Sequence, residues 1–278
     1  MRTKLNLVDI PTQNAQKLEK FFTNGKTKPA LMKTDEGFYV VKFSQNADGI
    51  KVLINEIICY QIAVMMGVPI PQAALINVEQ EVIDADERLQ EMEVKPGIHF
   101  GSHFLKKAQP SIQQPYLNLA KNTEDIPSII LFDQIIYNND RTENKGNILF
   151  DLKEREIVAI DHSHPFKIGA LWNETHLRQI QDEEFCLVRD FHGHNYRVLL
   201  KYVNGHNPFN TALQRLSNID KTKIEECFDI IPEGWELSTA EKNALIEFIW
   251  HRIENVESLL VLLHEQCPHW KGGISFGA

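Results

Sequence analysis

The sequence predicts an α+β fold in which a small β-rich N-terminal lobe with one helix precedes a larger, mainly helical C-terminal lobe. Three observations lead to this prediction. Short β-branched and aromatic runs separated by turns fill the first part of the chain, a nearly uninterrupted apolar helix follows, and helical periodicity dominates the C-terminal part. We place the N-terminal lobe at residues 1–80 and the C-terminal lobe at residues 81–278, with the join between residues 78 and 100.

The composition predicts a globular protein with an acidic surface. Hydrophobic residues make up 43% of the chain, and the formal net charge is -9 at pH 7. A basic face is needed to attract nucleic acid or an anionic membrane, so we expect neither partner. The four cysteines are scattered singly, residues 1–9 lack the apolar core of an export signal, and no apolar run reaches the ~18 residues of a membrane span. These features favour a reducing, cytoplasmic location.

The N-terminal lobe contains a predicted hairpin. Its strands are residues 28–33 and 38–43, and Asp35-Glu36-Gly37 is the turn between them. Lys42 lies inside the second apolar strand. It is either a strand lysine that extends its ammonium to water or a buried cation that needs an acidic partner.

The helix predicted over residues 52–66 should be buried on most faces. Its strongly polar residues are Asn55, Glu56 and Gln61. A buried carboxylate loses its hydration unless it is paired, so Glu56 is expected to form an ion pair with Lys42, with a position at a solvated edge as the alternative. Gly67 gives the helix a plausible C-terminal end.

The later elements are predicted from periodicity and turn residues. Residues 73–78 should form a strand, residues 96–102 a turn into the second lobe, and residues 128–138 a buried helix. Helical periodicity also marks residues 172–184, 196–204 and 211–219. The strongest pattern is a single helix over residues 239–266, which begins with a capping box between Ser238 and Glu241.

Three polar residues between the buried helix and the C-terminal helices form a candidate phosphotransfer site. Asp140 lies in a loop at the helix end, Asn147 precedes a strand over residues 148–150, and Asp161 ends a strand over residues 157–160. If these strands form a hairpin, the amide and the second carboxylate meet and can bind magnesium, which prefers few protein oxygen ligands. Asp140 would then face an incoming hydroxyl. Taken singly, Asp140 could be a loop cap and Asn147 a turn residue.

Lys42 and Glu56 add a cation for nucleotide phosphates and the carboxylate that holds it. The motifs in chain order are Gly25-Lys26-Thr27-Lys28-Pro29, Phe38-Tyr39-Val40-Val41-Lys42-Phe43, Asn55-Glu56, Gly67-Val68-Pro69-Ile70-Pro71, Phe132-Asp133, Asn139-Asp140-Arg141, Asn147-Ile148-Leu149 and Ile160-Asp161-His162. Over residues 20–265 this order resembles the HipA-like kinase domain. That family is a bacterial branch of the protein-kinase-like fold and is distantly related to the phosphoinositide kinases.

The resemblance implies a bilobal protein-kinase-like fold and a phosphotransferase of the serine/threonine kinase type. ATP and Mg²⁺ are the implied cofactors. The implied site residues are Asp140 as the catalytic base, Lys42 and Glu56 at the ATP phosphates, Gly25, Thr27 and Pro29 in the turn that covers them, and Asn147 and Asp161 as magnesium ligands.

Three features depart from the protein-kinase pattern. Asn144 is four places after Asp140 and Asn147 is seven, so neither has the kinase spacing of five. We prefer Asn147 as the ligand because it directly precedes a strand, and Asn144 is the alternative. Asp161-His162-Ser163 stands in place of Asp-Phe-Gly. The His-x-His pairs at 162/164 and 192/194 lack accompanying acidic or cysteine ligands, so His162 is expected to be a neighbour of the metal carboxylate.

Three functions are compatible with these residues. The preferred one is a kinase that phosphorylates a hydroxyl, most directly serine or threonine of a protein. The second is a nucleotide-binding scaffold that regulates a partner without catalysis. The third is a kinase for a small-molecule or lipid hydroxyl, and the lack of a basic run that could face a membrane disfavours the lipid. A regulatory partner is compatible with each.

Overall fold

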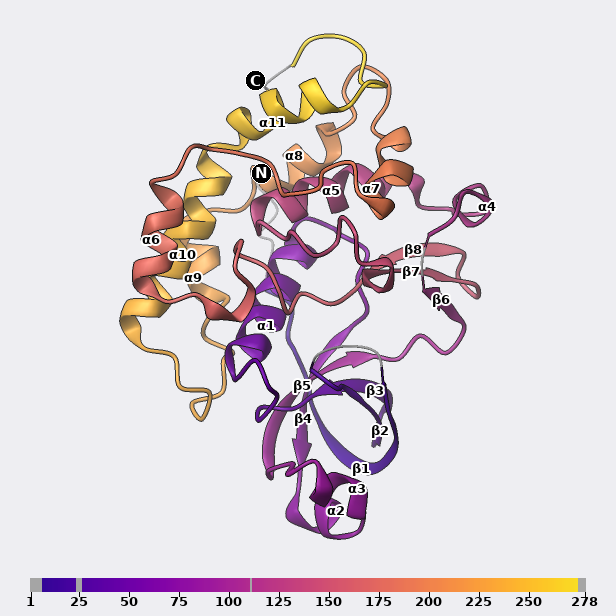
Figure 1. The fold of residues 1–278 in the computed structure, drawn as a ribbon, viewed down its shortest axis with the longest axis vertical. Helices are drawn as coiled ribbons and strands as arrows, with labels where there is room; N and C mark the ends of the chain where they lie inside the picture. The colour runs from indigo at the N-terminus through magenta and orange to yellow at the C-terminus, as the bar shows by residue number, and fades with distance from the viewer. Residues whose placement is uncertain (1–6, 24–26, 111, 275–278) are drawn as a thin grey trace.

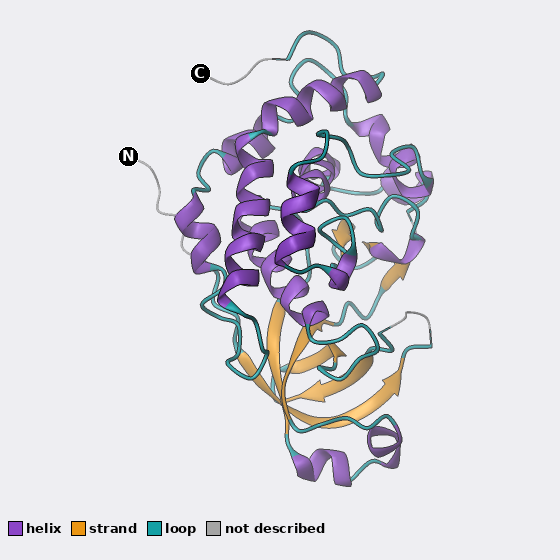
Figure 2. Cartoon of the chain, turned by 60° about the vertical axis from the view of Figure 1, so that its left-hand side comes forward, coloured by secondary structure: helices purple, strands orange, loops and turns teal. Residues whose placement is uncertain are grey.

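A closed five-stranded barrel and most of the helices occupy opposite ends of the molecule (Figure 1). The computed structural model describes residues 7–23, 27–110 and 112–274. The separation of strands from helices is the arrangement expected of an α+β fold, and it is plain when the chain is coloured by secondary structure (Figure 2).

The barrel confirms the predicted hairpin. Its strand order is β1 (Thr12–Phe21), β2 (Ala30–Thr34), β3 (Gly37–Lys42), β5 (Gly97–His103) and β4 (Ala73–Val78). β2 and β3 are antiparallel, and Gly37 at the turn has a φ of +141°, a conformation that glycine adopts far more readily than other residues. Parallel pairing of β1 with β4 closes the barrel, so that each strand of this sheet has a neighbour on both sides.

β5 corrects one expectation from the sequence. Residues 96–102 are not a turn into a second lobe, because Gly97–His103 pairs antiparallel with both β3 and β4. The sequence did not predict this strand partly because Gly101, in its middle, has a low strand propensity. A Cβ at position 101 would lie 2.5 Å from Ile76 Cγ1, so the close packing inside the barrel requires glycine there. The barrel therefore extends past the boundary placed at residue 80. The connection between β4 and β5 contains α2 (Gln80–Asp84) and α3 (Glu87–Glu91) at the outer end of the barrel (Figure 1).

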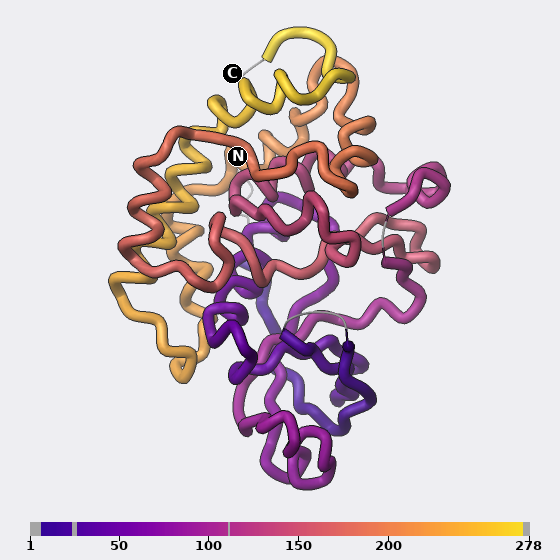
Figure 3. Tube along the Cα trace, in the orientation of Figure 1, coloured from indigo at the N-terminus to yellow at the C-terminus, as the bar shows by residue number. Residues whose placement is uncertain are grey.

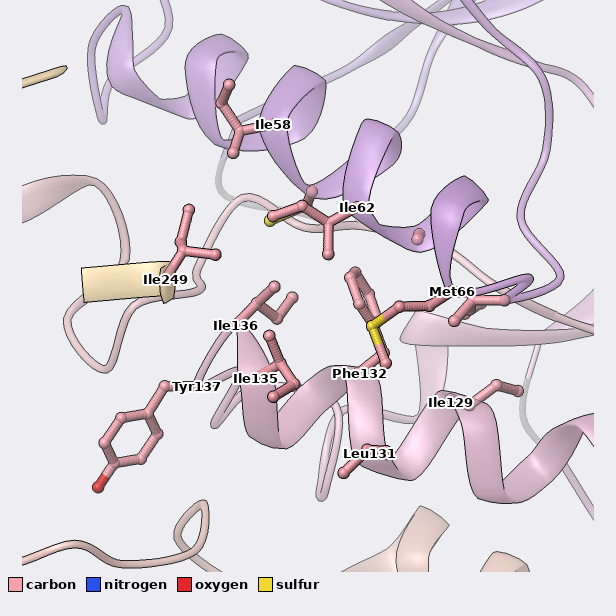
Figure 4. Packing of buried hydrophobic residues seen from close by; sticks show 14 of the residues in the cluster. Ile58, Ile62, Met66, Ile129, Leu131, Phe132, Ile135, Ile136, Tyr137 and Ile249 are labelled. Atoms are coloured by element: carbon pink, nitrogen blue, oxygen red, sulfur yellow. The ribbon is translucent and has the colours of Figure 1, made fainter. Parts of the chain in front are cut away.

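α1 (Lys51–Met65) is the expected buried helix, and it links the barrel to the helical part. It packs on α5 (Ile126–Ile135), the second helix that the sequence predicts to be buried. In Figure 4, Ile58 and Ile62 of α1 lie on the side of that helix toward α5, and Ile62 points toward Phe132 of α5. Each fully buried aliphatic side chain contributes about 1.5–3 kcal/mol, so the seam fixes α1 against α5. In the Cα trace, α1 lies between the barrel and the yellow C-terminal helices (Figure 3).

The second predicted pair of strands is also confirmed. β7 (Ile148–Asp151) and β8 (Glu156–Ala159) are antiparallel, and β6 (Ala108–Pro110) pairs with β7 on its other side. Ile148 lies opposite Ala159 in this ladder. Asn147 and Asp161, which flank these positions, are therefore brought to the same end of the hairpin.

The remaining helices form the end of the molecule away from the barrel. They are α4 (Gln114–Leu117), α6 (Glu174–Gln181), α7 (His194–Leu199), α8 (Asn210–Leu216), α9 (Lys221–Glu226), α10 (Thr239–Glu254) and α11 (Val256–Gln266). The capping box of Ser238 and Glu241 opens α10 as predicted. None of the helices in the described residues combines the length and the apolar content that a bilayer crossing needs.

The prediction of one continuous helix over residues 239–266 is wrong. The helix breaks at Asn255, where α10 ends and α11 begins. The Asn255 side chain donates a hydrogen bond to the carbonyl of His251 at 2.8 Å, and such local bonding competes with the regular helical ladder. The apolar pattern continues across the break, which is why periodicity alone joined the two helices.

Candidate active site

Lys42, at the end of β3, contacts carboxylates from two other parts of the chain. Its Nζ lies 2.5 Å from Glu56 Oε1 on α1 and 2.6 Å from Asp161 Oδ1, just after β8. Lys42 and Glu56 are buried, so the lysine does not extend to water and the glutamate does not lie at a solvated edge. The predicted ion pair is present, and Asp161 joins it.

Ser163 completes the surroundings of the lysine. Its Oγ lies 2.5 Å from Lys42 Nζ and 2.7 Å from Asp161 Oδ1. The ammonium group has three N–H donors, and Glu56, Asp161 and Ser163 provide one acceptor for each. The sequence showed Ser163 only as part of the Asp-His-Ser turn, and its contact with a lysine more than a hundred residues away has no local signal.

The three charged groups shift one another's protonation. Burial by itself would lower the pKa of Lys42, but the carboxylates of Asp161 and Glu56 outweigh it and raise that pKa. Burial would raise the pKa of Asp161 and of Glu56, but the Lys42 ammonium outweighs it and lowers both. All three groups are therefore charged at neutral pH.

His162 lies on the α1 side of this cluster. Its backbone N–H donates to Glu56 Oε1 at 3.0 Å, and its Nδ1 lies 3.6 Å from Glu56 Oε2. Its ring packs edge-on against Phe132 of α5, with 5.5 Å between ring centroids. From the sequence we expected His162 to lie beside the metal-binding carboxylate of Asp161. In the structure its side chain lies against Glu56, the carboxylate that pairs with Lys42.

Asp140 is held by both candidate asparagines. Its Oδ2 accepts hydrogen bonds from Asn147 Nδ2 at 2.5 Å and from Asn144 Nδ2 at 3.2 Å. An ionised carboxylate only accepts, so it fixes which side of each amide faces it. The amide oxygen of Asn147 is thereby left for another donor or for a cation. Asn147 is also the more buried of the two asparagines, and it leads directly into β7.

A buried arginine supports the loops on both sides of the site. Arg141 Nε donates to Asp133 Oδ1 at 2.9 Å, and Tyr196 donates its hydroxyl proton to Asp133 Oδ2 at 2.9 Å. Arg141 Nη1 donates to the carbonyl of Ile160, at 2.9 Å, and to that of Asn147. One guanidinium thus holds the backbone at Asn147 and the residue before Asp161. The sequence contained Arg141 and Asp133 only as parts of motifs and gave no reason to pair them.

The backbone at Asp161 directs its carboxylate. Asp161 has a φ of 59°, in the left-handed region that aspartate tolerates better than most residues. Within the described part of the chain, the hydrogen bonds it accepts, from Lys42, Ser163 Oγ and Ser163 N, all go to Oδ1. Its side chain remains 35% exposed, so solvent reaches it.

A cavity of about 440 Å³ opens beside these groups. Lys42, Glu56, Asn144, Asn147, Asp161 and His162 line its polar part, and Pro29, Val40, Tyr60, Ile70, Phe100, Leu149 and Ile160 are among its apolar walls. Of the described residues proposed for the site, Asp140 and Thr27 do not line it. Asp140 lies beside it through Asn147, and Thr27 is buried in the turn before β2. Gly25 lies outside the described residues.

The donor atoms at the polar end suit a small hard cation. The described residues contain no cluster of three or more histidine, cysteine, aspartate or glutamate side chains that could hold a metal. The candidate ligands at the cavity are the amide oxygen of Asn147 and the carboxylate of Asp161, since Glu56 pairs with Lys42 and the side-chain oxygen of Asn144 accepts from Gly146 N. Mg²⁺ is commonly bound by one or two protein oxygens and completed by phosphate and water, so this sparse set fits it.

A lysine paired with a helical glutamate, next to an aspartate and an asparagine at one cavity, is an arrangement typical of protein-kinase-like phosphotransferases. The chain belongs to the HipA-like kinase family, whose model matches residues 16–264. No curated protein sequence matches it.

A solved kinase structure shares the fold, and a second is similar to a lesser degree. The Helicobacter pylori proinflammatory kinase CtkA is 12% identical, with 90% of this chain and 99% of that chain covered at a TM-score of 0.55. The Golgi casein kinase is 12% identical, with 89% and 73% covered at a TM-score of 0.43. The family match identifies the chain as a kinase, and the similarity to CtkA shows that its α+β fold is kinase-like.

Proposed function

We propose that this chain is an ATP- and Mg²⁺-dependent kinase that transfers the γ-phosphoryl group to a hydroxyl, most directly serine or threonine of a protein. One observation carries the proposal. The Lys42–Glu56 pair, Asp161 and Asn147 come from distant parts of the chain and line one cavity, and Asp140 is hydrogen-bonded to that asparagine.

The barrel and the helical part act as the two lobes of this kinase, with the cavity between them. The apolar walls, which include Val40 and Leu149, receive the base of ATP, and Lys42 binds its phosphates while Glu56 orients the ammonium. The turn that contains Gly25, Thr27 and Pro29 covers the phosphates. The support for this last assignment is that Pro29 lines the cavity.

Asp140 is the base that receives the acceptor's proton. Asn144 and Asn147 bond its Oδ2, and this fixes the carboxylate with Oδ1 available to accept the proton of a bound hydroxyl. The hydroxyl oxygen bonds to the γ-phosphorus as the bond to the ADP oxygen breaks, and the proton passes to Asp140. When bound, Mg²⁺ would be held by Asn147 and Asp161, with Asn144 as the alternative to Asn147, and would neutralise phosphate charge.

The net charge of the chain bears on its proposed acceptor and location. The chain is acidic overall, with a formal net charge of -9. This favours a protein acceptor over nucleic acid or an anionic membrane surface, and it is compatible with a cytoplasmic location. A regulatory protein partner would add control of this activity.

One observation favours the second candidate, a nucleotide-binding regulatory scaffold. Each N–H donor of Lys42 already has an acceptor within the chain, so binding of phosphates requires the lysine to exchange at least one partner. If that exchange does not occur, nucleotide can bind without becoming oriented for transfer.

The test is incubation of the protein with γ-labelled ATP and Mg²⁺, alone and with a cell lysate. We expect label on protein, and Asp140→Asn should lower kcat by about 10²- to 10⁴-fold while sparing most of the ATP affinity. Asp151→Asn, at the far end of the β7–β8 hairpin, is the matched control and should keep wild-type turnover. Wild-type turnover in Asp140→Asn would contradict its role, and ATP binding without transfer would favour the scaffold.

A further inference from the structure

The segment that follows the active-site aspartate, residues 161–172, has an unusual backbone. Asp161, Phe166, Lys167 and Gly169 have φ values of 59°, 55°, 70° and 70°, in the left-handed region. Three of the four are not glycine, and bulky residues such as Phe166 adopt this conformation only where surrounding contacts impose it. The segment therefore depends on contacts from outside itself.

Asn55 of α1 provides several of these contacts. It is completely buried, and its Nδ2 donates to the carbonyl of Ser163 at 3.0 Å and to that of Gly169 at 3.3 Å. Its Oδ1 accepts the indole proton of Trp172 at 2.9 Å. One amide side chain thus bonds the segment near its beginning, near its middle and at its end.

Lys51, one helical turn before Asn55, adds a second tie. Its Nζ donates to the carbonyl of Trp172 at 2.6 Å and lies 4.4 Å from the centroid of a Trp172 ring. The same ammonium pairs with Glu241 in the first turn of α10, at 2.6 Å. We call Lys51, Asn55 and Trp172 the α1 latch. It joins one face of α1 to the segment and to α10.

We propose that Asn55 is a positioning residue for the active site. It is the neighbour of Glu56 in the sequence, so the helix that presents Glu56 to Lys42 also holds Ser163. Ser163 bonds Asn55 through its carbonyl, and it contacts Lys42 and Asp161 through its hydroxyl. The latch therefore fixes the position of Asp161 and Ser163 relative to the Lys42–Glu56 pair, and when it opens the segment moves while the pair stays.

The proposal rests on the proposed kinase function for its kinetic readout but not for its structural readout. Asn55→Ala should lower kcat by about 10²-fold, since displacement of active-site groups by about 1 Å has effects of that size. KM for ATP should change by less than about threefold, because the Lys42–Glu56 pair remains. The matched control is Gln61→Ala, a buried amide on the same helix whose Nε2 donates to the carbonyl of Val8, away from the segment.

The structural readout is amide hydrogen exchange in the ligand-free protein. The amides of Phe166 and Lys167 donate to the carbonyls of Ile136 and Tyr137 at 2.7 and 3.0 Å. We expect Asn55→Ala to accelerate their exchange by at least about tenfold, the factor that 1.4 kcal/mol of lost local stability produces, and Gln61→Ala to leave it unchanged. Unchanged exchange in Asn55→Ala would overturn the latch. Faster exchange with wild-type kcat would overturn the positioning role.

Two further variants keep the test decisive if Asn55→Ala does not fold. Lys51→Met removes the tie at Trp172 and α10, and Trp172→Phe removes the indole donor together with part of the buried ring. Both should accelerate exchange of Phe166 and Lys167 and lower kcat by smaller factors than Asn55→Ala, and wild-type values in both would overturn the proposal. If the wild-type protein transfers no phosphoryl group, the proposed function fails, and hydrogen exchange still decides whether the latch exists.

Discussion

Two buried ion pairs serve the same site in different ways. Lys42 lies between Glu56 and Asp161 at the wall of the cavity, whereas Arg141 and Asp133 lie beneath the loops with side chains 0% exposed. Lysine is a compact charge on a flexible stem, which suits the exchange of a carboxylate for a phosphate that the proposed function requires. Arginine offers a rigid, planar set of donors, which suits a group that must keep two backbone carbonyls in place. We therefore propose that the Lys42–Glu56 pair exchanges ligands and that the Arg141–Asp133 pair gives permanent support.

The largest effect on stability should come from breaking the Arg141–Asp133 pair. Asp133→Ala leaves the buried Arg141 guanidinium without its counter-charge, which should lower the free energy of unfolding by about 3–5 kcal/mol in urea titrations. The control is Glu247→Ala, which breaks an exposed ion pair with Lys221 and should cost less than about 1 kcal/mol.

A double variant separates charge burial from positioning. Asp133→Leu combined with Arg141→Met removes both charges, so it should regain much of the stability lost in Asp133→Ala. It should not regain activity, because the carbonyls of Asn147 and Ile160 lose their donor. Wild-type turnover in the double variant would show that the pair only fills space.

Replacement of Lys42 should affect activity more than stability, which is the reverse of the effect expected at the Arg141–Asp133 pair. Lys42→Met should lower kcat/KM by about 10²- to 10³-fold, the cost of removing one electrostatic group from a reacting site. The free energy of unfolding should fall by only about 1–3 kcal/mol, because Glu56 keeps hydrogen bonds from His162 N and Ser163 Oγ. Paired measurements of kcat/KM and urea unfolding check both. A stability loss as large as that of Asp133→Ala would erase the distinction between the pairs.

The two pairs also differ in how far the sequence predicted them. Lys42 and Glu56 stood out because each is a charge inside an apolar run, and a local pattern is enough to reveal such a conflict. The β2–β3 hairpin, α1, α5 and the β7–β8 hairpin were predicted for the same reason: each is specified by periodicity over a few neighbouring residues. That hairpin also brought Asn147 and Asp161 to one end of a sheet.

Features that depend on distant contacts were missed. Closure of the barrel by parallel β1–β4 pairing joins segments about sixty residues apart, and β5 contains a glycine that only its packing against Ile76 explains. Ser163 and the Arg141–Asp133 pair are defined by partners that no local pattern indicates. Asn55 did leave a signal, since a buried amide in an apolar helix must find hydrogen-bond partners, but the sequence could not say where they lie.

The smallest effect should be a difference in pH dependence. Lys42 lowers the pKa of Glu56 and Asp161 in the folded state, so each folded carboxylate binds fewer protons than its unfolded counterpart. The stability they contribute is therefore fully present above the unfolded values, near pH 4, and is lost as the pH falls below them. Water screens Asp161, whose side chain is 35% exposed, so most of the effect belongs to Glu56.

Lysine at position 42 does not oppose this trend. Its pKa is raised in the folded state, so its contribution is complete below the unfolded value near 10.4 and is lost only as the pH rises through the higher folded value. The stability difference between wild type and Lys42→Met should thus be largest near neutral pH. It should shrink as the pH falls, beginning above the unfolded pKa of Glu56, because without Lys42 burial raises the pKa of that carboxyl. Urea unfolding of both proteins from pH 3 to pH 9 measures it. If the free energies of unfolding of the two proteins changed in parallel down to pH 3, Lys42 would not hold the two carboxylates in their charged form. The Lys42–Glu56 pair would then have no electrostatic role.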